Sequence, residues 1–301
     1  MNTYFGAGRE PVETQKNRVS WYDYGARMYD PSLGRWHVVD PKAEKYYSFS
    51  PFVYGANNPL LFIDPNGEEI WIYYTDDDGN EQKLQYKQGM KYKGNNDFVA
   101  TTVGSLNQMD NVQIGGAVLS DLVDSKSQFN FTNTFAKDKK GNDVKDALAF
   151  AKDKKGGGEI HAGALMESIP DGQKLESTAH ELFHGYQYDN GQTLNGSMKT
   201  INNEVGAYLF GRAVTLSSGN GMLGWGNNTN AGYAYEQAME SLIYAPTFNS
   251  NQYNTAVSNF KLGSSVNVGK NGVAGQGPYR NYKIDTALKN PLIKKLFPLL
   301  R

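Results

Sequence analysis

The sequence contains no cysteine and only four histidines among its 301 residues. Without cysteine, the chain can form no disulfide framework, no cysteine nucleophile and no zinc site built on thiolates. Its 30 Lys and Arg residues nearly balance its 31 Asp and Glu residues, and a net charge of −1 argues against a protein that coats nucleic acid. No stretch approaches the roughly 18 consecutive apolar residues of a membrane-spanning helix. The sequence therefore predicts neither a nucleic-acid partner nor a stable membrane span.

Two of the four histidines lie four positions apart, with a glutamate directly after the first. Residues 180–184 have the pattern H-E-x-x-H, inside a helix predicted over residues 174–188. Because residues four apart share one face of a helix, His180 and His184 present two imidazoles to one metal ion, and Glu181 lies beside them as a base. A solvated polar face is the alternative, but the two bulky apolar residues inside the motif favour burial.

Zinc at a catalytic site takes three protein ligands and leaves a fourth position to water. The candidate for the third ligand is Glu204, which lies 20 positions (204 − 184) after His184 and begins the next predicted helix, residues 204–216. The loop between them, residues 189–199, is rich in Asn, Gly and Ser and can turn the chain so that the two helices face each other. An acidic residue in the first turn of a helix also has an ordinary explanation, because the helix dipole favours it.

These residues resemble the glutamate-zincin (gluzincin) metallopeptidases. That group combines H-E-x-x-H with a glutamate about twenty residues later, often preceded by asparagine, as Asn203 precedes Glu204. The resemblance covers residues 175–212. It implies Zn²⁺ bound by the two histidines and Glu204, with Glu181 as the general base and a protein or peptide as the substrate.

The sequence departs from this family at two places. Many members carry an aspartate four residues after the ligand glutamate, where it orients a ligand histidine, whereas this chain has Tyr208. No histidine follows Glu204, so a tyrosine or an arginine would have to stabilise the oxyanion. The candidates, which the sequence does not rank, are Tyr188, Tyr208, Arg212, Tyr233 and Tyr235.

Residues 1–67 differ in sequence pattern from the rest of the chain. Short aromatic runs alternate with Asp-Pro, Asn-Pro and Asn-Gly turns, which predicts β-hairpins that need neighbouring strands. The residues from Trp21 to Gly67 resemble the RHS repeat-associated core domain, which closes the shell of large bacterial RHS proteins. The resemblance implies that residues 68–301 are a toxin or effector cargo, with a parent RHS shell and a cognate immunity protein as partners.

Members of the RHS family often cleave themselves after an Asp-Pro-x-Gly motif, and Asp64 occupies the matching place. A simple turn before Pro65 is the alternative. The first residues lack a basic region followed by an apolar run, so they do not form a signal peptide. We therefore expect secretion, or delivery to a target cell, as part of a larger RHS protein.

Residues 68–301 are expected to form an α+β domain of the zincin type, with a small sheet and active-site helices. The predicted strands are residues 70–75, 82–86, 128–132 and 159–165, and the predicted helices are residues 98–109, 117–123, 174–188, 204–216, 231–244 and 290–300. The zincin resemblance implies that the strand at residues 159–165 is the sheet edge along which a peptide lies, near His161. A histidine without a catalytic role is the alternative there.

Several smaller features are interpreted as ordinary structure. The cluster Asp76–Asp78 predicts an exposed turn rather than a calcium loop, since it lacks the spacing of one. The segment at residues 135–141 recurs at residues 150–156, and both copies are expected to be solvated basic turns. Asp171 is expected to be the N-cap of the motif helix.

The sequence thus predicts a zinc metallopeptidase that hydrolyses peptide bonds of a target protein. Two other classes of function stay open. One is a structural or adhesive RHS tip whose metal site does not catalyse a reaction. The other is a zinc hydrolase of a non-peptide amide in the cell wall.

Overall fold

The computed structural model describes residues 22–23, 28–30, 33, 35–36, 70–125, 127–138, 140–153, 157–167, 169–221, 228–266, 279 and 281–300. The chain divides into two compact units, residues 1–68 and residues 69–301. In the first unit, β1 (Tyr22–Asp23), β2 (Met28–Asp30) and β3 (Arg35–Trp36) form an antiparallel sheet in that order. Asp64, the residue expected at a self-cleavage site, lies outside the described residues.

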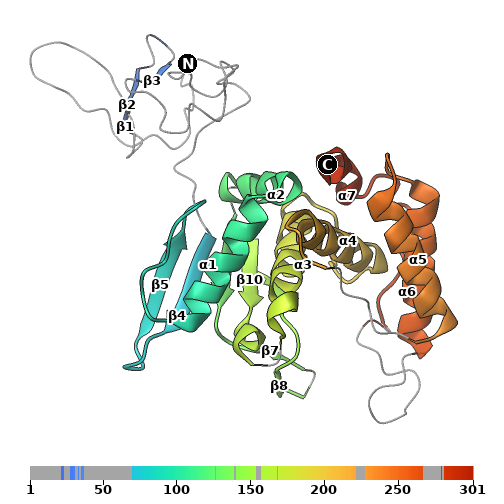
Figure 1. The fold of residues 1–301 in the computed structure, drawn as a ribbon, viewed down its shortest axis with the longest axis horizontal. Helices are drawn as coiled ribbons and strands as arrows, with labels where there is room; N and C mark the ends of the chain where they lie inside the picture. Colours follow the sequence, from blue (N-terminus) through green and yellow to red (C-terminus); the bar gives the residue numbers. More distant parts are fainter. Residues whose placement is uncertain are drawn as a thin grey trace, which may run out of the picture. The chain divides into compact units, whose positions relative to one another are not determined.

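The second unit is an α+β fold built on a small mixed sheet (Figure 1). The strand order is β5-β4-β6-β10-β9, with bounds β4 Ile70–Thr75, β5 Glu81–Tyr86, β6 Gln128–Thr132, β9 Ala149–Lys152 and β10 Gly157–His161. The three central strands run parallel, and the two outer strands, β5 and β9, pair antiparallel to their neighbours. Ile72, Phe131 and Ile160, which are register partners on the three central strands, are fully buried, as expected for one face of a sheet against a core.

Six longer helices and one short helix complete the described part of the second unit. They are α1 (Asp97–Asp110), α2 (Gln113–Val123), α3 (Asp171–Asp189), α4 (Ile201–Ser217), α5 (Asn230–Tyr244), α6 (Ser250–Val266) and α7 (Leu292–Leu296), the last followed by a 3-10 turn at Phe297–Leu300. Helices α1 and α3 pack on the sheet, and α4 lies against α3 (Figure 1). The α3 helix therefore connects the sheet to the remaining helices.

Most predicted elements are present, but α6 was missed. Its sequence is rich in Ser and Asn, which have low helix propensity, so composition argued against a helix. The apolar positions Tyr253, Ala256, Val257 and Phe260 nevertheless follow the helical spacing of three and four, and all four are buried. Tertiary packing of this stripe, mainly against α5, stabilises a helix that propensity alone does not support.

Two expectations about the strand before α3 are wrong. β10 ends at His161, and residues 163–166 form a 3-10 turn instead of continuing the strand. β10 also lies between β6 and β9, so it is an interior strand and the sheet edge is β9. The edge was misassigned because residues 149–152 pair with β10 through contacts that local sequence does not reveal.

Both repeated basic segments begin in a strand, β7 (Ala136–Lys137) or β9, and lead to a chain reversal. In the first copy, the carboxylate of Asp138 accepts hydrogen bonds from the amides of Lys140 and Asn142, which confirms an exposed turn between β7 (Ala136–Lys137) and β8 (Asp143–Val144). In the second copy, residues 150–152 belong to β9 rather than to a turn, and the amide of Asp153 donates to the backbone oxygen of Gly157 at 3.1 Å, as the amide of Asp138 donates to that of Asn142 at 2.9 Å.

The two remaining turn expectations have opposite outcomes. The predicted turn at Asp76 is confirmed, because its carboxylate accepts from the amides of Asp78 and Asn80. Asp171 does not cap α3, because Pro170 holds the N-cap position and Asp171 lies in the first turn, paired with Lys174 at 2.6 Å. Among the residues described, no helix combines the length and apolar character needed to cross a membrane.

Candidate metal centre

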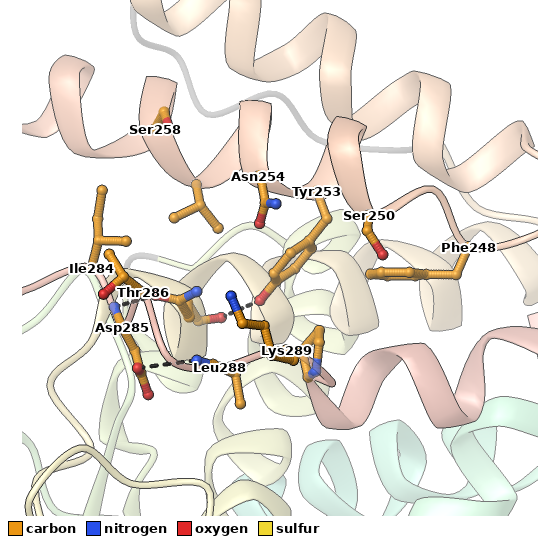
Figure 2. A pocket seen from close by; sticks show the side chains of 13 residues that line it. Phe248, Ser250, Tyr253, Asn254, Ser258, Ile284, Asp285, Thr286, Leu288 and Lys289 are labelled. Carbon is orange, nitrogen blue, oxygen red and sulfur yellow. Dashed lines mark hydrogen bonds between the residues drawn. The ribbon is translucent and has the colours of Figure 1, made fainter.

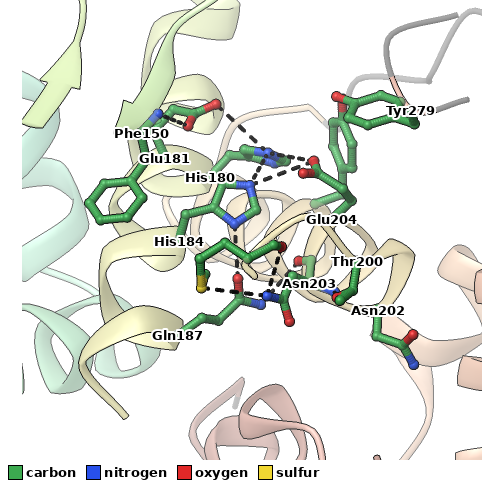
Figure 3. Close-up of polar contacts among 12 residues, drawn as sticks. Phe150, His180, Glu181, His184, Gln187, Thr200, Asn202, Asn203, Glu204 and Tyr279 are labelled. Carbon is green, nitrogen blue, oxygen red and sulfur yellow. Dashed lines mark hydrogen bonds and ion pairs between the residues drawn. The ribbon is translucent and has the colours of Figure 1, made fainter. Parts of the chain in front are cut away.

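The candidate metal centre lies where α3 and α4 face each other. On each helix, residues four apart share a face. Their side chains form three contacts across the interface, each between one residue of α3 and one of α4 (Figure 3 shows the last). The three contacts are Glu176 with Arg212, His180 with Tyr208, and His184 with Glu204. The fold therefore brings the H-E-x-x-H histidines to Glu204 through a simple helix-to-helix register.

Three ligand atoms converge at one end of this interface. His180 Nε2 and His184 Nε2 are 3.1 Å apart, and each lies 3.6 Å from Glu204 Oε2. Tetrahedral zinc with bonds of about 2.0–2.1 Å keeps its ligand atoms about 3.3–3.4 Å apart. The three residues are buried, and their donor atoms can hold a metal ion together. Their spacing matches that of ligands around one ion better than that of direct hydrogen bonds between His and Glu.

The buried carboxylate of Glu204 is stabilised by a positive charge beside it. Burial by itself lowers the pKa of His184, but the negative charge of Glu204 outweighs it and raises that pKa to about 9. Burial by itself raises the pKa of Glu204, but the charge of His184 outweighs it and lowers that pKa to about 2. A divalent cation bound to neutral imidazoles supplies this positive charge in place of a proton.

One of the two candidate ligand histidines is oriented by its own helix. His184 Nδ1 donates to Gln187 Oε1 at 2.9 Å, and Gln187 Nε2 donates to the backbone oxygen of Asn203 at 3.0 Å. A histidine whose Nδ1 carries the proton leaves Nε2 free for a metal. Gln187 is fully buried and lies three residues after His184, so helical spacing could have predicted it as a partner of that histidine.

The other ligand histidine has different surroundings. Among the residues described, His180 Nδ1 has no hydrogen-bond partner. Its ring instead packs edge-on against Tyr208, with the ring centroids 4.3 Å apart. Tyr208 therefore contacts a ligand histidine through its ring, at the place where many gluzincins have an aspartate.

Local structure also fixes the position of Glu204. Thr200 caps α4, and its hydroxyl accepts from the amide of Asn203 at 3.1 Å. The side chain of Asn203 donates to the backbone oxygens of Gln192 and Met198, both at 3.0 Å. These bonds tie the loop between the helices to the first turn of α4, where Glu204 lies one residue further on.

Glu181 lies between the ligand histidines and the sheet edge. Its Oε2 accepts a hydrogen bond from the backbone amide of Phe150 in β9 at 2.7 Å, and its Oε1 is 3.8 Å from His180 Nε2 (Figure 3). Sequence reasoning missed Phe150, because the segment that contains it was interpreted as a turn. The structure thus places a carboxylate next to both the candidate metal ligands and an edge strand.

The five candidates for oxyanion stabilisation have different surroundings. Tyr208 is closest to the cluster, and its hydroxyl bonds to that of Tyr279 at 3.0 Å. Burial, together with the charge of Glu204, raises the pKa of Tyr208, so its hydroxyl keeps its proton. Tyr279 lies 71 positions beyond Tyr208, and no pattern in the sequence pointed to it.

The other four candidates contact groups away from the metal ligands. Arg212 is engaged by Glu236, Tyr235 is buried in the core, Tyr233 is exposed, and the hydroxyl of Tyr188 donates to the backbone of Asp153. His161 lies outside the cluster of ligands, and its Nδ1 bonds to the hydroxyl of Thr134 at 2.8 Å.

Comparison with known proteins identifies no family for this chain. No protein-family model matches it, and no solved structure matches it. Among curated proteins, it is similar to salivary gland surface protein 1 of Aedes aegypti, with 47% identity over 47 residues. That match covers 16% of this chain and 1% of the mosquito protein, so the chain spans only a small fraction of the length of this relative. The function of this chain must therefore be inferred from the geometry of the site.

Proposed function

We propose that residues 69–301 form a zinc-dependent peptidase with a zincin-like active site. One observation carries this proposal: the buried cluster of His180, His184 and Glu204 lies directly beside the carboxylate of Glu181. Two imidazole nitrogens and one carboxylate oxygen are a ligand set that suits zinc, and three protein ligands leave a coordination position open.

The chain's own residues supply the proton transfers of hydrolysis. When bound, zinc would polarise the carbonyl under attack and favour ionisation of water. Glu181 takes the proton from the attacking water and then passes it to the leaving amine nitrogen. The amide of Phe150 holds one oxygen of this carboxylate at 2.7 Å, which orients the other oxygen toward the ligand histidines.

The sheet edge supports a peptide as the substrate. β9 is the last strand in the sheet order, and the amide of Phe150 points away from β10 toward Glu181. An extended peptide can pair with such an edge through main-chain hydrogen bonds, which would bring a scissile bond beside the base. This arrangement favours peptide bonds over a cell-wall amide.

We further propose that the first unit is an RHS core segment that carries the peptidase as a toxin or effector. The support is the run of aromatic and turn motifs from Trp21 to Gly67, together with the division of the chain into units at residues 68 and 69. The substrate would then be a protein of a rival or host cell, and a cognate immunity protein would bind the peptidase.

The experiment that tests this function compares three purified proteins: wild type, Glu204→Ala and Glu181→Gln. We expect near-stoichiometric zinc by elemental analysis in wild type and Glu181→Gln, and loss of zinc in Glu204→Ala. Hydrolysis of a peptide library should fall by about 10²- to 10⁴-fold in Glu181→Gln, as expected for loss of a general base. Cell-wall fragments serve as the second substrate class.

Two results would overturn the proposal. Wild type without bound zinc would remove the metal centre, and equal turnover by wild type and Glu181→Gln would remove the base. Cleavage of cell-wall amides but not of peptides would replace the substrate class. Toxicity on expression in a sensitive cell, compared between the same proteins, tests the role as an effector.

A further inference from the structure

A cavity lies in the same unit, and its lining does not include the candidate metal ligands. Its volume is about 330 Å³, at the lower end of the range typical of small-molecule sites (Figure 2). One wall is α6, and the other is the segment at residues 284–291. The floor includes Asn202, in the first turn of α4.

The two walls combine apolar and polar side chains. On α6, Ser250, Asn254 and Ser258 are spaced by four and therefore share one face, beside an apolar pair, Tyr253 and Val257. The opposite wall contributes Ile284 and Leu288, with Thr286 next to them. A ligand between these walls would meet an apolar surface along its length and hydrogen-bonding groups along one side.

The walls are held in place before any ligand binds. The hydroxyl of Tyr253 donates to the backbone oxygen of Asn202 at 2.7 Å, and the side-chain oxygen of Asn202 accepts from the amide of Asp285 at 2.7 Å. Asp285 in turn accepts from the amides of Ala287 and Leu288 through one oxygen. A preformed site loses less conformational freedom when it binds a ligand.

Two opposite charges line this cavity without neutralising each other. Neither the ammonium of Lys289 nor the carboxylate of Asp285 forms an ion pair with any residue that the structure describes. The side chains of Ser250, Asn254 and Ser258 likewise have no hydrogen-bond partner in the described ranges. One cation, one anion and several neutral hydrogen-bonding groups therefore belong to the lining of one cavity, and one oxygen of the anion is bonded within its own turn.

We propose that this cavity binds a short peptide with free termini and apolar side chains. Lys289 receives its C-terminal carboxylate, Asp285 receives its N-terminal ammonium, and the side chains lie between Val257 and Leu288. A single anion or a purely apolar molecule would match only part of this lining. The inference goes beyond the proposed peptidase activity and does not depend on it.

The test uses the full-length chain with ¹³C-labelled methyl groups in Ile, Leu and Val. The Glu181→Gln background prevents turnover of the probe. Leucyl-leucine is titrated against the protein, and its capped analogue, N-acetyl-leucyl-leucine amide, is the matched probe without charges. We expect saturable shifts of the methyl groups of Val257, Ile284 and Leu288 with the free dipeptide and much weaker shifts with the capped one.

Three variants test whether Lys289 and Asp285 bind the charged ends of the peptide. Lys289→Met and Asp285→Asn should each weaken binding by about two- to fivefold, the range of a solvent-exposed ion pair. Asp285→Asn keeps the oxygen that accepts from the two amides, so the wall keeps its shape. Lys295→Met, an exposed lysine outside the cavity, should bind like the parent protein.

Some outcomes would overturn the proposal. No saturable shift of these methyl groups, or equal shifts with the free and capped probes, would show that the cavity does not recognise a charged peptide. Unchanged affinity in both Lys289→Met and Asp285→Asn would do the same. All these measurements report on binding in the cavity, so they test the proposal whether or not the protein is a peptidase.

Discussion

The two ends of the α3–α4 interface hold buried charges in two different ways. At one end, Arg212 makes direct bonds of 2.7 and 2.9 Å to Glu236 and has Glu176 at 3.8 Å. At the other end, Glu204 stands 3.6 Å from both ligand histidines. The first arrangement is a closed ion pair, whereas the second leaves its charged and polar atoms around a shared point.

This contrast distinguishes a structural charge cluster from a candidate metal site. Buried charges cost free energy unless they are paired and hydrogen-bonded, and Arg212 is paired within the protein through two hydrogen bonds to Glu236, although its Nε has no hydrogen-bond partner among the described residues. Glu204 and its two histidines come closer to meeting it when a cation joins them. Distances between donor atoms, rather than the mere presence of buried charges, therefore identify the candidate metal centre.

Removing Arg212 should have the largest effect on stability. Arg212→Ala leaves Glu236 and Glu176 without their cation, and we expect the free energy of unfolding to fall by about 3 kcal/mol, the lower end for a broken buried pair because Glu236 is partly exposed. Urea unfolding of the metal-free protein measures it, with the exposed Lys295→Ala as a control. A loss below about 1 kcal/mol would place this pair with surface ion pairs.

Glu204→Gln, in contrast, should mainly lower the affinity for zinc. It keeps the shape of the side chain but removes the ligand charge, so zinc affinity should fall by more than about 100-fold, beyond the loss of an outer-shell partner. Competition with a chromophoric chelator measures the affinity. Glu236→Gln is the matched control at the other end of the interface, and it should lower stability while zinc affinity stays unchanged. Equal zinc affinities in the two variants would remove the distinction between the two ends.

Gln187→Leu should weaken zinc binding by about 10- to 100-fold, because His184 loses the group that holds its Nδ1 proton. Gln187→Glu keeps an acceptor at that place and should bind zinc more tightly than Gln187→Leu. The same chelator competition measures both variants. If the two variants bind zinc equally well, Gln187 only fills space.

The pH dependence of zinc binding sharpens the comparison further. In the metal-free protein, the pKa of His184 is raised from 6.5 to about 9, so this group contributes stability below pH 6.5 and loses it as the pH rises to about 9. The pKa of Glu204 is lowered from 4.5 to about 2, so its contribution is present above pH 4.5 and is lost as the pH falls toward 2.

Zinc must therefore displace the proton of His184 at neutral pH. We expect release of about one proton per zinc at pH 7, and an affinity that rises by up to about tenfold per pH unit until about pH 9. Calorimetry in two buffers with different ionisation enthalpies counts the protons. A proton count near zero at pH 7 would contradict the raised pKa.

Much of the fold could be read from the sequence because its signals are local. Strands β4 and β6 and helices α1 and α4 have an alternating or helical spacing of apolar residues that short-range geometry dictates. The missed helix α6 shows the limit of this reasoning, because its Ser- and Asn-rich composition hid an apolar stripe that packs mainly on α5.

The residues of the candidate site likewise divide into those that local sequence patterns predict and those that they do not. The sequence by itself determined that His180 and His184 share a helix face with Glu181 beside them, because helical periodicity relates residues a few positions apart. Gln187 belongs to the same local pattern, although it was not recognised. The spacing of 20 positions after His184, at the start of the next predicted helix, made Glu204 a candidate but did not establish its distance from the histidines.

Only the tertiary structure decided which distant groups complete the site. The register of α3 against α4 brought Glu204 to the histidines, and the pairing of β9 with β10 brought the amide of Phe150 to Glu181. Tyr279 reached Tyr208 from 71 positions further along the chain. Strand order and helix register depend on how whole surfaces pack, and spacing along the chain does not carry that information.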